Sequence, residues 1–150
     1  MGAGDLAKDG VIRLSVDLPV PTEIAWSLIT DNAHIARWWG AYATLEPVLG
    51  GSFRETWSNG SREVVTSGRV LAFEPPTRLL LSWADDDWPG PTTVAFAVSE
   101  APSGARVELV HDGWQVHPAG RRARLMADHA AGWRHHLDNL AAHAAGLAAT

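Results

Sequence analysis

The stretch that decides the fold is residues 107–145, VELVHDGWQVHPAGRRARLMADHAAGWRHHLDNLAAHAA. Its first part alternates apolar and polar residues and predicts a strand over 106–111. From about 120 to 145, apolar residues recur every three or four positions, which is the spacing of one face of a helix. This stripe consists of Met126, Ala130, Trp133, Leu137, Leu140 and Ala144. We therefore expect one half-buried strand followed by one long amphipathic helix.

The residues before this stretch form short alternating segments separated by turn signals such as Gly50-Gly51, Asn59-Gly60 and Pro75-Pro76. Such segments are typical of antiparallel strands. The expected strands are 11–17, 43–47, 52–57, 62–73 (with a kink at Gly68), 78–83, 92–99 and 106–111, and two short helices are expected at 23–30 and 33–39. A curved antiparallel sheet of about six to seven strands around the long helix would bury both apolar surfaces. The predicted class is α+β.

Length and composition exclude several classes of protein. The chain has 150 residues and is 46% hydrophobic, which suits one domain with a real core rather than a disordered segment. It has no cysteine, so disulfides, thiol catalysis and cysteine–zinc sites are excluded. The net charge of −5 disfavours a nucleic-acid partner bound through phosphate neutralisation.

The chain ends and the hydropathy bear on location. The first ten residues lack a secretory signal, and no apolar run approaches the roughly 18–20 residues of a membrane span. We therefore expect a cytoplasmic protein without a membrane partner. The expected domain covers 11–145, with flexible termini at 1–10 and 146–150.

Tryptophan is overrepresented. Eight tryptophans stand against one tyrosine and three phenylalanines, which is more large apolar surface than a small core usually needs. The expected helices place Trp26 and Trp133 on core faces, whereas Trp88 and Trp114 fall in loops that could border a cavity mouth. The rings either fill an unusually thick core or line a cavity.

Several local strings resemble those of one family. They are AWSLITD at 25–31, RWWG at 37–40, GGSF at 50–53, GRVL at 68–71 before EPP at 74–76, LLSW at 80–83, VELVH at 107–111 with Gly113-Trp114, and GWR at 132–134. In this order they are similar to single-domain bacterial members of the START-like (SRPBCC) superfamily, in the subgroup named after the activator of the Hsp90 ATPase. The resemblance covers about residues 11–142. It implies a helix-grip fold with a deep cavity between the sheet and the last helix, but no single reaction, because that fold hosts lipid carriers, hormone receptors, cyclases and co-chaperone domains.

Inward-facing residues of the strands and helices are the candidates for the lining of this implied cavity. The candidates are Trp39, Phe53, Glu55, Trp57, Leu81, Trp83, Phe96, Leu109, His111, Met126, His129 and Trp133. An aromatic cavity with a few polar groups is typical of a small-molecule site. The alternative is that the rings simply fill the space.

Two polar residues interrupt apolar faces. Glu55 lies between Phe53 and Trp57, and His111 follows Leu109 on its strand. If both face the cavity, they could orient a ligand or act as acid and base. The alternative is that each reaches solvent at a strand end or is satisfied by local hydrogen bonds.

No metal site or cofactor is expected. Three histidines recur every seven residues on the last helix, at 129, 136 and 143, and are therefore separated by two turns, or about 10 Å along the axis. That distance is too long to share one ion. The acidic run 85–87 and the arginines at 121, 122, 124 and 134 are interpreted as solvated surface.

Three functions follow as hypotheses. The first is a small-molecule binding protein that holds an apolar or aromatic ligand in the cavity. The second is an enzyme of the cyclase or hydrolase type that uses polar groups there, for which no catalytic residue is assigned. The third, implied by the subgroup name alone, is a partner of an Hsp90-type chaperone. A homodimer built on exposed strand edges or on the outer aromatic residues stays open in each case.

Overall fold

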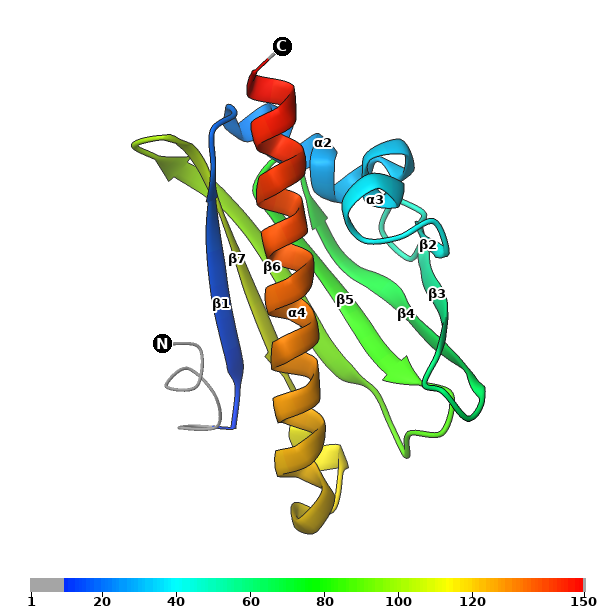
Figure 1. Cartoon of the computed structure of the whole chain (residues 1–150). Helices are drawn as coiled ribbons and strands as arrows, with labels where there is room; N and C mark the ends of the chain where they lie inside the picture. Colours follow the sequence, from blue (N-terminus) through cyan, green and yellow to red (C-terminus); the bar gives the residue numbers. More distant parts are fainter. Residues whose placement is uncertain (1–9, 150) are drawn as a thin grey trace.

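The computed structural model describes residues 10–149 (Figure 1). Its elements in chain order are β1 (Ile12–Leu18), α2 (Thr22–Thr30), α3 (Asn32–Trp38), β2 (Ala43–Leu45), β3 (Ser52–Ser58), β4 (Glu63–Glu74), β5 (Arg78–Asp85), β6 (Thr92–Ala101), β7 (Gly104–Asp112), the 3-10 turn η1 (Trp114–Val116) and α4 (Ala119–Ala148). The seven strands form one sheet in the order β1-β7-β6-β5-β4-β3-β2. Every neighbouring pair is antiparallel.

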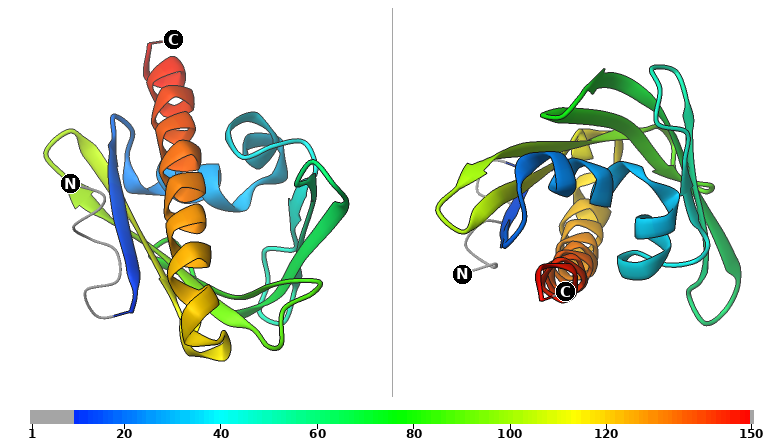
Figure 2. Two further views of the ribbon diagram at one scale, coloured as in Figure 1. Left: turned by 60° about the horizontal axis from the view of Figure 1, so that its bottom comes forward. Right: turned by 90° about the horizontal axis from the view of Figure 1, so that it is seen from above.

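The sheet curves around α4, which lies on its concave side (Figure 2). Helices α2 and α3 connect the two edge strands and lie beside the C-terminal half of α4 (Figure 1). This arrangement confirms the predicted α+β helix-grip fold, with two short helices after the first strand. It also leaves the N-terminal half of α4 facing the other end of β3, β4 and β5.

The long helix buries the predicted stripe. Its buried residues are Met126, Ala130, Trp133, Leu137, Leu140 and Ala144. α4 runs three residues past the predicted domain end at 145, so positions 146–148 are helical. Of the segments expected to be flexible, residues 1–9 and Thr150 lie outside the described residues.

The short helices begin one residue earlier than predicted. α3 starts at Asn32 because Asp31 caps it, with its carboxylate Oδ1 accepting the Ala33 N–H at 3.0 Å. An aspartate at this position satisfies an otherwise unpaired helix N–H.

The predicted kink at Gly68 is displaced along β4. The pairing of β4 with β5 shifts register between Val70 and Ala72, not at Gly68. Glycine is needed at position 68 for a different reason: a Cβ atom there would overlap the Ser82 carbonyl oxygen. Glycine therefore permits close approach of two strands at this point.

Within residues 10–149, no helix is long and apolar enough to cross a membrane.

Candidate functional site

The centre of the molecule is filled by packed aromatic rings. Phe53 stacks on Trp83 with a ring-centre distance of 5.2 Å, and Trp133 contacts Trp83 at 5.0 Å and Trp39 at 5.3 Å. Seven of the twelve candidate cavity residues lie in or around this packed region and do not line the pocket described below; they are Trp39, Phe53, Leu81, Phe96, Leu109, His111 and Met126. In the middle of the sheet the rings thus fill the space.

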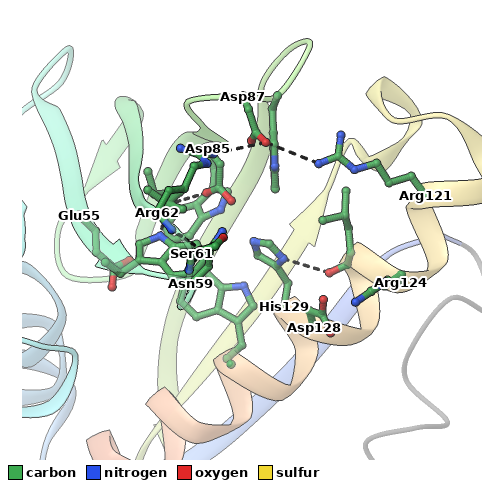
Figure 3. A pocket seen from close by; sticks show the side chains of 18 of the residues that line it. Glu55, Asn59, Ser61, Arg62, Asp85, Asp87, Arg121, Arg124, Asp128 and His129 are labelled. Atoms are coloured by element: carbon green, nitrogen blue, oxygen red, sulfur yellow. Dashed lines mark hydrogen bonds and ion pairs between the residues drawn. The ribbon is translucent and has the colours of Figure 1, made fainter.

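A pocket of about 920 Å³ lies beside these rings, between the β3–β5 end of the sheet and the N-terminal half of α4 (Figure 3). The other five candidates line it: Glu55, Trp57, Trp83, His129 and Trp133. Trp88 adds a fourth tryptophan, and Thr66 and Asp85 add polar groups. The structure therefore brings part of the predicted set together, displaced toward one end of the helix.

Three polar residues form one row across the pocket wall. Glu55 of β3 pairs with Thr66 of β4, and Thr66 pairs with Asp85 of β5. Residues directly opposite one another on neighbouring strands point to the same face. The two carboxyl groups therefore share the pocket with a threonine between them.

A chain of hydrogen bonds fixes the Asp85 side of this row. The Trp57 indole N–H donates to Thr66 Oγ1 at 2.9 Å, and the Thr66 hydroxyl donates to Asp85 Oδ1 at 2.6 Å. Burial raises the pKa of Asp85 above its usual value, and the Thr66 hydrogen bond offsets part of that shift. Asp85 is thus held in place while it carries a desolvation cost.

Glu55 is the second carboxyl group of the pocket wall whose pKa is raised. Burial raises its pKa, and the nearby charge of Asp85 raises it further. The indole N–H of Trp39 lies close enough to offset part of the shift, although its geometry falls short of a well-aligned hydrogen bond. Both carboxyl groups therefore bind protons more readily than exposed ones.

His129 projects from α4 into the same space (Figure 3). Its Nδ1 lies 3.0 Å from the Leu125 carbonyl oxygen, which can only accept a hydrogen bond. The ring therefore carries its proton on Nδ1, and Nε2 presents a lone pair. Burial lowers the pKa of His129, while the Leu125 hydrogen bond and the Asp85 charge oppose the shift. The site thus combines a neutral proton acceptor with two carboxyl groups.

His111 lies in the core and does not line the pocket. It is fully buried, its Nδ1 accepts the Trp133 indole N–H at 3.0 Å, and its Nε2 lies 2.7 Å from Thr92 Oγ1. The Thr92 hydroxyl donates to the Trp83 carbonyl at 2.8 Å, so Nε2 must be the donor to Thr92. Burial holds the pKa of His111 well below its usual value. Both ring nitrogens are satisfied locally, which leaves none for a ligand.

The two loop tryptophans differ in their surroundings. Trp114 is fully buried and donates its indole N–H to the His111 carbonyl at 3.0 Å, so the expectation that it borders the mouth is wrong. Trp88 lines the pocket, with its ring 5.3 Å from His129 and 4.5 Å from His117. These contacts anchor the loop between β5 and β6 against α4.

The interpretation of the acidic run as solvated loop holds for two of its three residues. Asp86 and Asp87 are exposed and form ion pairs with Arg62, at 3.0 and 3.4 Å. Asp85, however, is the last residue of β5 and lines the pocket. One signal in the sequence could have placed Asp85 there: it continues the alternation of Leu81 and Trp83, so the three residues share one strand face.

The rim of the pocket carries arginines and an exposed acid of α4. Arg121 and Arg124, interpreted as solvated helix face, both line it, and Arg121 reaches Asp87 at 3.8 Å. Asp128 lies beside them on α4 and is exposed. Among residues 10–149, no group of three or more histidine, aspartate or glutamate side chains could hold a metal ion. The pocket lining therefore combines aromatic faces with carboxyl, guanidinium and imidazole groups.

Comparison with known families identifies the fold family. The family model described as Activator of Hsp90 ATPase homolog 1-like protein matches residues 19–145. The chain belongs to this family. The match and the solved structures confirm the resemblance to the START-like (SRPBCC) superfamily, whose fold is a ligand-binding fold.

Several solved structures share the fold of this chain. CalU16 from Micromonospora echinospora is 28% identical with a TM-score of 0.66, over 89% of this chain and 74% of its own. Protein Ms6760 from Mycobacterium smegmatis is 14% identical with a TM-score of 0.74, over 92% of both chains. DynU16, described as a protein in the dynemicin biosynthetic locus, is 23% identical with a TM-score of 0.69, over 89% of this chain and 46% of its own. No curated protein matches the chain.

Proposed function

We propose that this protein binds a small molecule with a flat apolar or aromatic part in the pocket between β3–β5 and α4. The observation that carries the proposal is a pocket of about 920 Å³ with four tryptophans in its lining. Small-molecule sites are typically concave, lined by apolar and aromatic side chains and supplied with a few polar groups. The chain also belongs to a family with a ligand-binding fold, which supports the same function.

The tryptophans supply stacking surface that is already in position. Trp83 and Trp133 are buried, and Trp57 is fixed by its hydrogen bond to Thr66. Rings that are ordered before binding lose little conformational freedom when a ligand arrives. A flat ligand therefore gains contact area at low entropic cost.

A glycine on α4 provides the test. Gly132 lines the pocket, and a Cβ atom built there meets no atom within 4 Å. The substitution Gly132→Leu should therefore place its side chain in the pocket without displacing the core. Gly146 is equally free of neighbours and does not line the pocket, so Gly146→Leu is the matched control.

The readout is isothermal titration calorimetry with naphthylmethanol as the probe. We expect binding to the wild type and to Gly146→Leu, and a loss of at least about tenfold in affinity for Gly132→Leu, since the side chain occupies the space of the ring. Leucine is favoured over glycine in a helix interior by about 0.8 kcal/mol, so Gly132→Leu should melt about 2–3 °C higher than the wild type. Unchanged affinity in Gly132→Leu, or failure of both naphthylmethanol and its charged analogues to bind the wild type, would contradict the proposal.

An enzymatic role is the second candidate, and it is favoured by the presence in one pocket of Asp85 and His129, each of which shifts the pKa of the other. A carboxyl group with a raised pKa can donate a proton, and a neutral imidazole can accept one. The test is mass spectrometry of a ligand after incubation with the protein. Conversion by the wild type that is lost in His129→Gln, at an affinity within about twofold, would support it. Absence of conversion would leave a binding protein.

The remaining expectations stay predictions. They are a cytoplasmic location, a homodimer and a partnership with an Hsp90-type chaperone. The last is tested by the ATPase rate of the chaperone with and without this protein, where a clear change would support the partnership.

A further inference from the structure

Two half-buried carboxyl groups in the pocket wall lack a cationic partner. Among residues 10–149, neither Glu55 nor Asp85 forms an ion pair. The exposed Asp87 on the rim, in contrast, contacts Arg62 and Arg121. The chain thus supplies permanent positive charge at the rim, whereas the basic group near Asp85 is the His129 imidazole, whose pKa is lowered by burial.

The spacing of these groups leaves room for a ligand atom. Glu55 and Asp85 are two strands apart in one row, which puts their Cβ atoms about 10 Å apart. Thr66 between them donates its hydroxyl to Asp85 and accepts the Trp57 N–H, so it does not neutralise Glu55. A group bound above Thr66 can approach both carboxyl groups at once.

The aromatic lining of the pocket favours a positively charged group. Trp57, Trp83, Trp88 and Trp133 line the pocket together with the two carboxyl groups. A cation over the face of a tryptophan ring is attracted by its negative π-surface, most strongly where water is excluded. Aromatic faces combined with unpaired carboxylates are the chemistry that recognises an organic cation.

We propose that the ligand of this pocket is an organic amine, with its ammonium group between Glu55 and Asp85 and its ring against the tryptophans. This inference rests on the proposed ligand-binding function and names the ligand class. An anionic ligand would meet two carboxyl groups at that depth, and a neutral one would leave their charges uncompensated. Burial raises the pKa of both Glu55 and Asp85, and an ammonium group between them would lower both pKa values again.

The test compares three probes of matched size by calorimetry at pH 7.5: naphthylmethylamine, naphthylmethanol and naphthoate. We expect the amine to bind at least about tenfold more tightly than the alcohol, and naphthoate to bind most weakly. Glu55→Gln and Asp85→Asn keep the shape of each side chain and remove its charge. Each should weaken amine binding about fivefold to tenfold while leaving alcohol binding within about twofold, which also shows that the variant is folded.

Asp138→Asn is the matched control, because it removes the same charge from an exposed position of α4 outside the pocket. It should change amine affinity by less than about twofold. Equal affinity for amine and alcohol, tightest binding of naphthoate, or an equal loss in Asp138→Asn would overturn the amine proposal and leave the ligand-binding function standing. Failure of all three probes to bind would overturn both.

Discussion

The hydrogen bond between Trp133 and His111 can be measured by a double-mutant cycle. His111 is fully buried and Trp133 is 2% exposed, and their contact is the Trp133 N–H to His111 Nδ1 hydrogen bond of 3.0 Å. His111→Leu removes the acceptor, Trp133→Phe removes the donor, and the double variant removes both. The cycle asks whether His111 is a structural residue of the core.

The expected magnitude follows from the partners that each change leaves behind. In His111→Leu the Trp133 N–H becomes a buried donor without an acceptor, at a cost of about 1–3 kcal/mol. Thr92 is less affected, because its hydroxyl still donates to the Trp83 carbonyl. Once phenylalanine replaces Trp133, that donor no longer exists. The double variant should therefore be more stable than the sum of the single losses by about 1–3 kcal/mol.

The assay is urea denaturation of the four proteins at pH 7.5, followed by far-UV circular dichroism, since one of the tryptophans is changed. A coupling free energy of about 1 kcal/mol or more supports the assignment. Additivity within about 0.5 kcal/mol would refute it, because the two side chains would then contribute independently.

Two further predictions concern the stability of the protein at acidic pH and the packing of neighbouring strands. Burial lowers the pKa of His136 to about 4, so the folded state keeps it neutral; its contribution to stability is complete above pH 6.5 and is lost as pH falls toward 4. His136→Gln should therefore lose about 2–3 kcal/mol less unfolding free energy than the wild type between pH 7 and pH 4.5, and an identical pH dependence in urea denaturation would contradict this. Gly68→Ala should lower the unfolding free energy by about 2–4 kcal/mol, because its Cβ overlaps the Ser82 carbonyl oxygen, and a change within about 0.5 kcal/mol would show that the strands separate freely there.

The sequence predicted the fold because each apolar face had one clear periodicity. Every residue of the α4 stripe is buried, from Met126 to Ala144. The strand faces were equally readable: Val107 and Leu109 are buried, as their alternation indicates. These patterns determine which way a side chain points, and the fold follows from which faces must be covered.

The position of the pocket was not predictable in this way. Alternation shows that Phe53, Glu55 and Trp57 face inward on β3, but not where the helix lies over the strand. Phe53 packs under the central rings, whereas Glu55 and Trp57 lie at the uncovered end of the strand and line the pocket. Asp85 was missed for a related reason, because three consecutive aspartates resemble a solvated loop until the strand is known to end at the first of them.

A ligand in this pocket should lie against four particular tryptophans. The most direct measurement is a two-dimensional nitrogen–proton NMR spectrum of the indole N–H groups during titration with naphthylmethylamine. We expect shifts for the pocket tryptophans Trp57, Trp83, Trp88 and Trp133, and none for Trp26 and Trp38, which are buried away from the pocket. Shifts confined to Trp26 and Trp38, or no shifts at saturating probe, would contradict it.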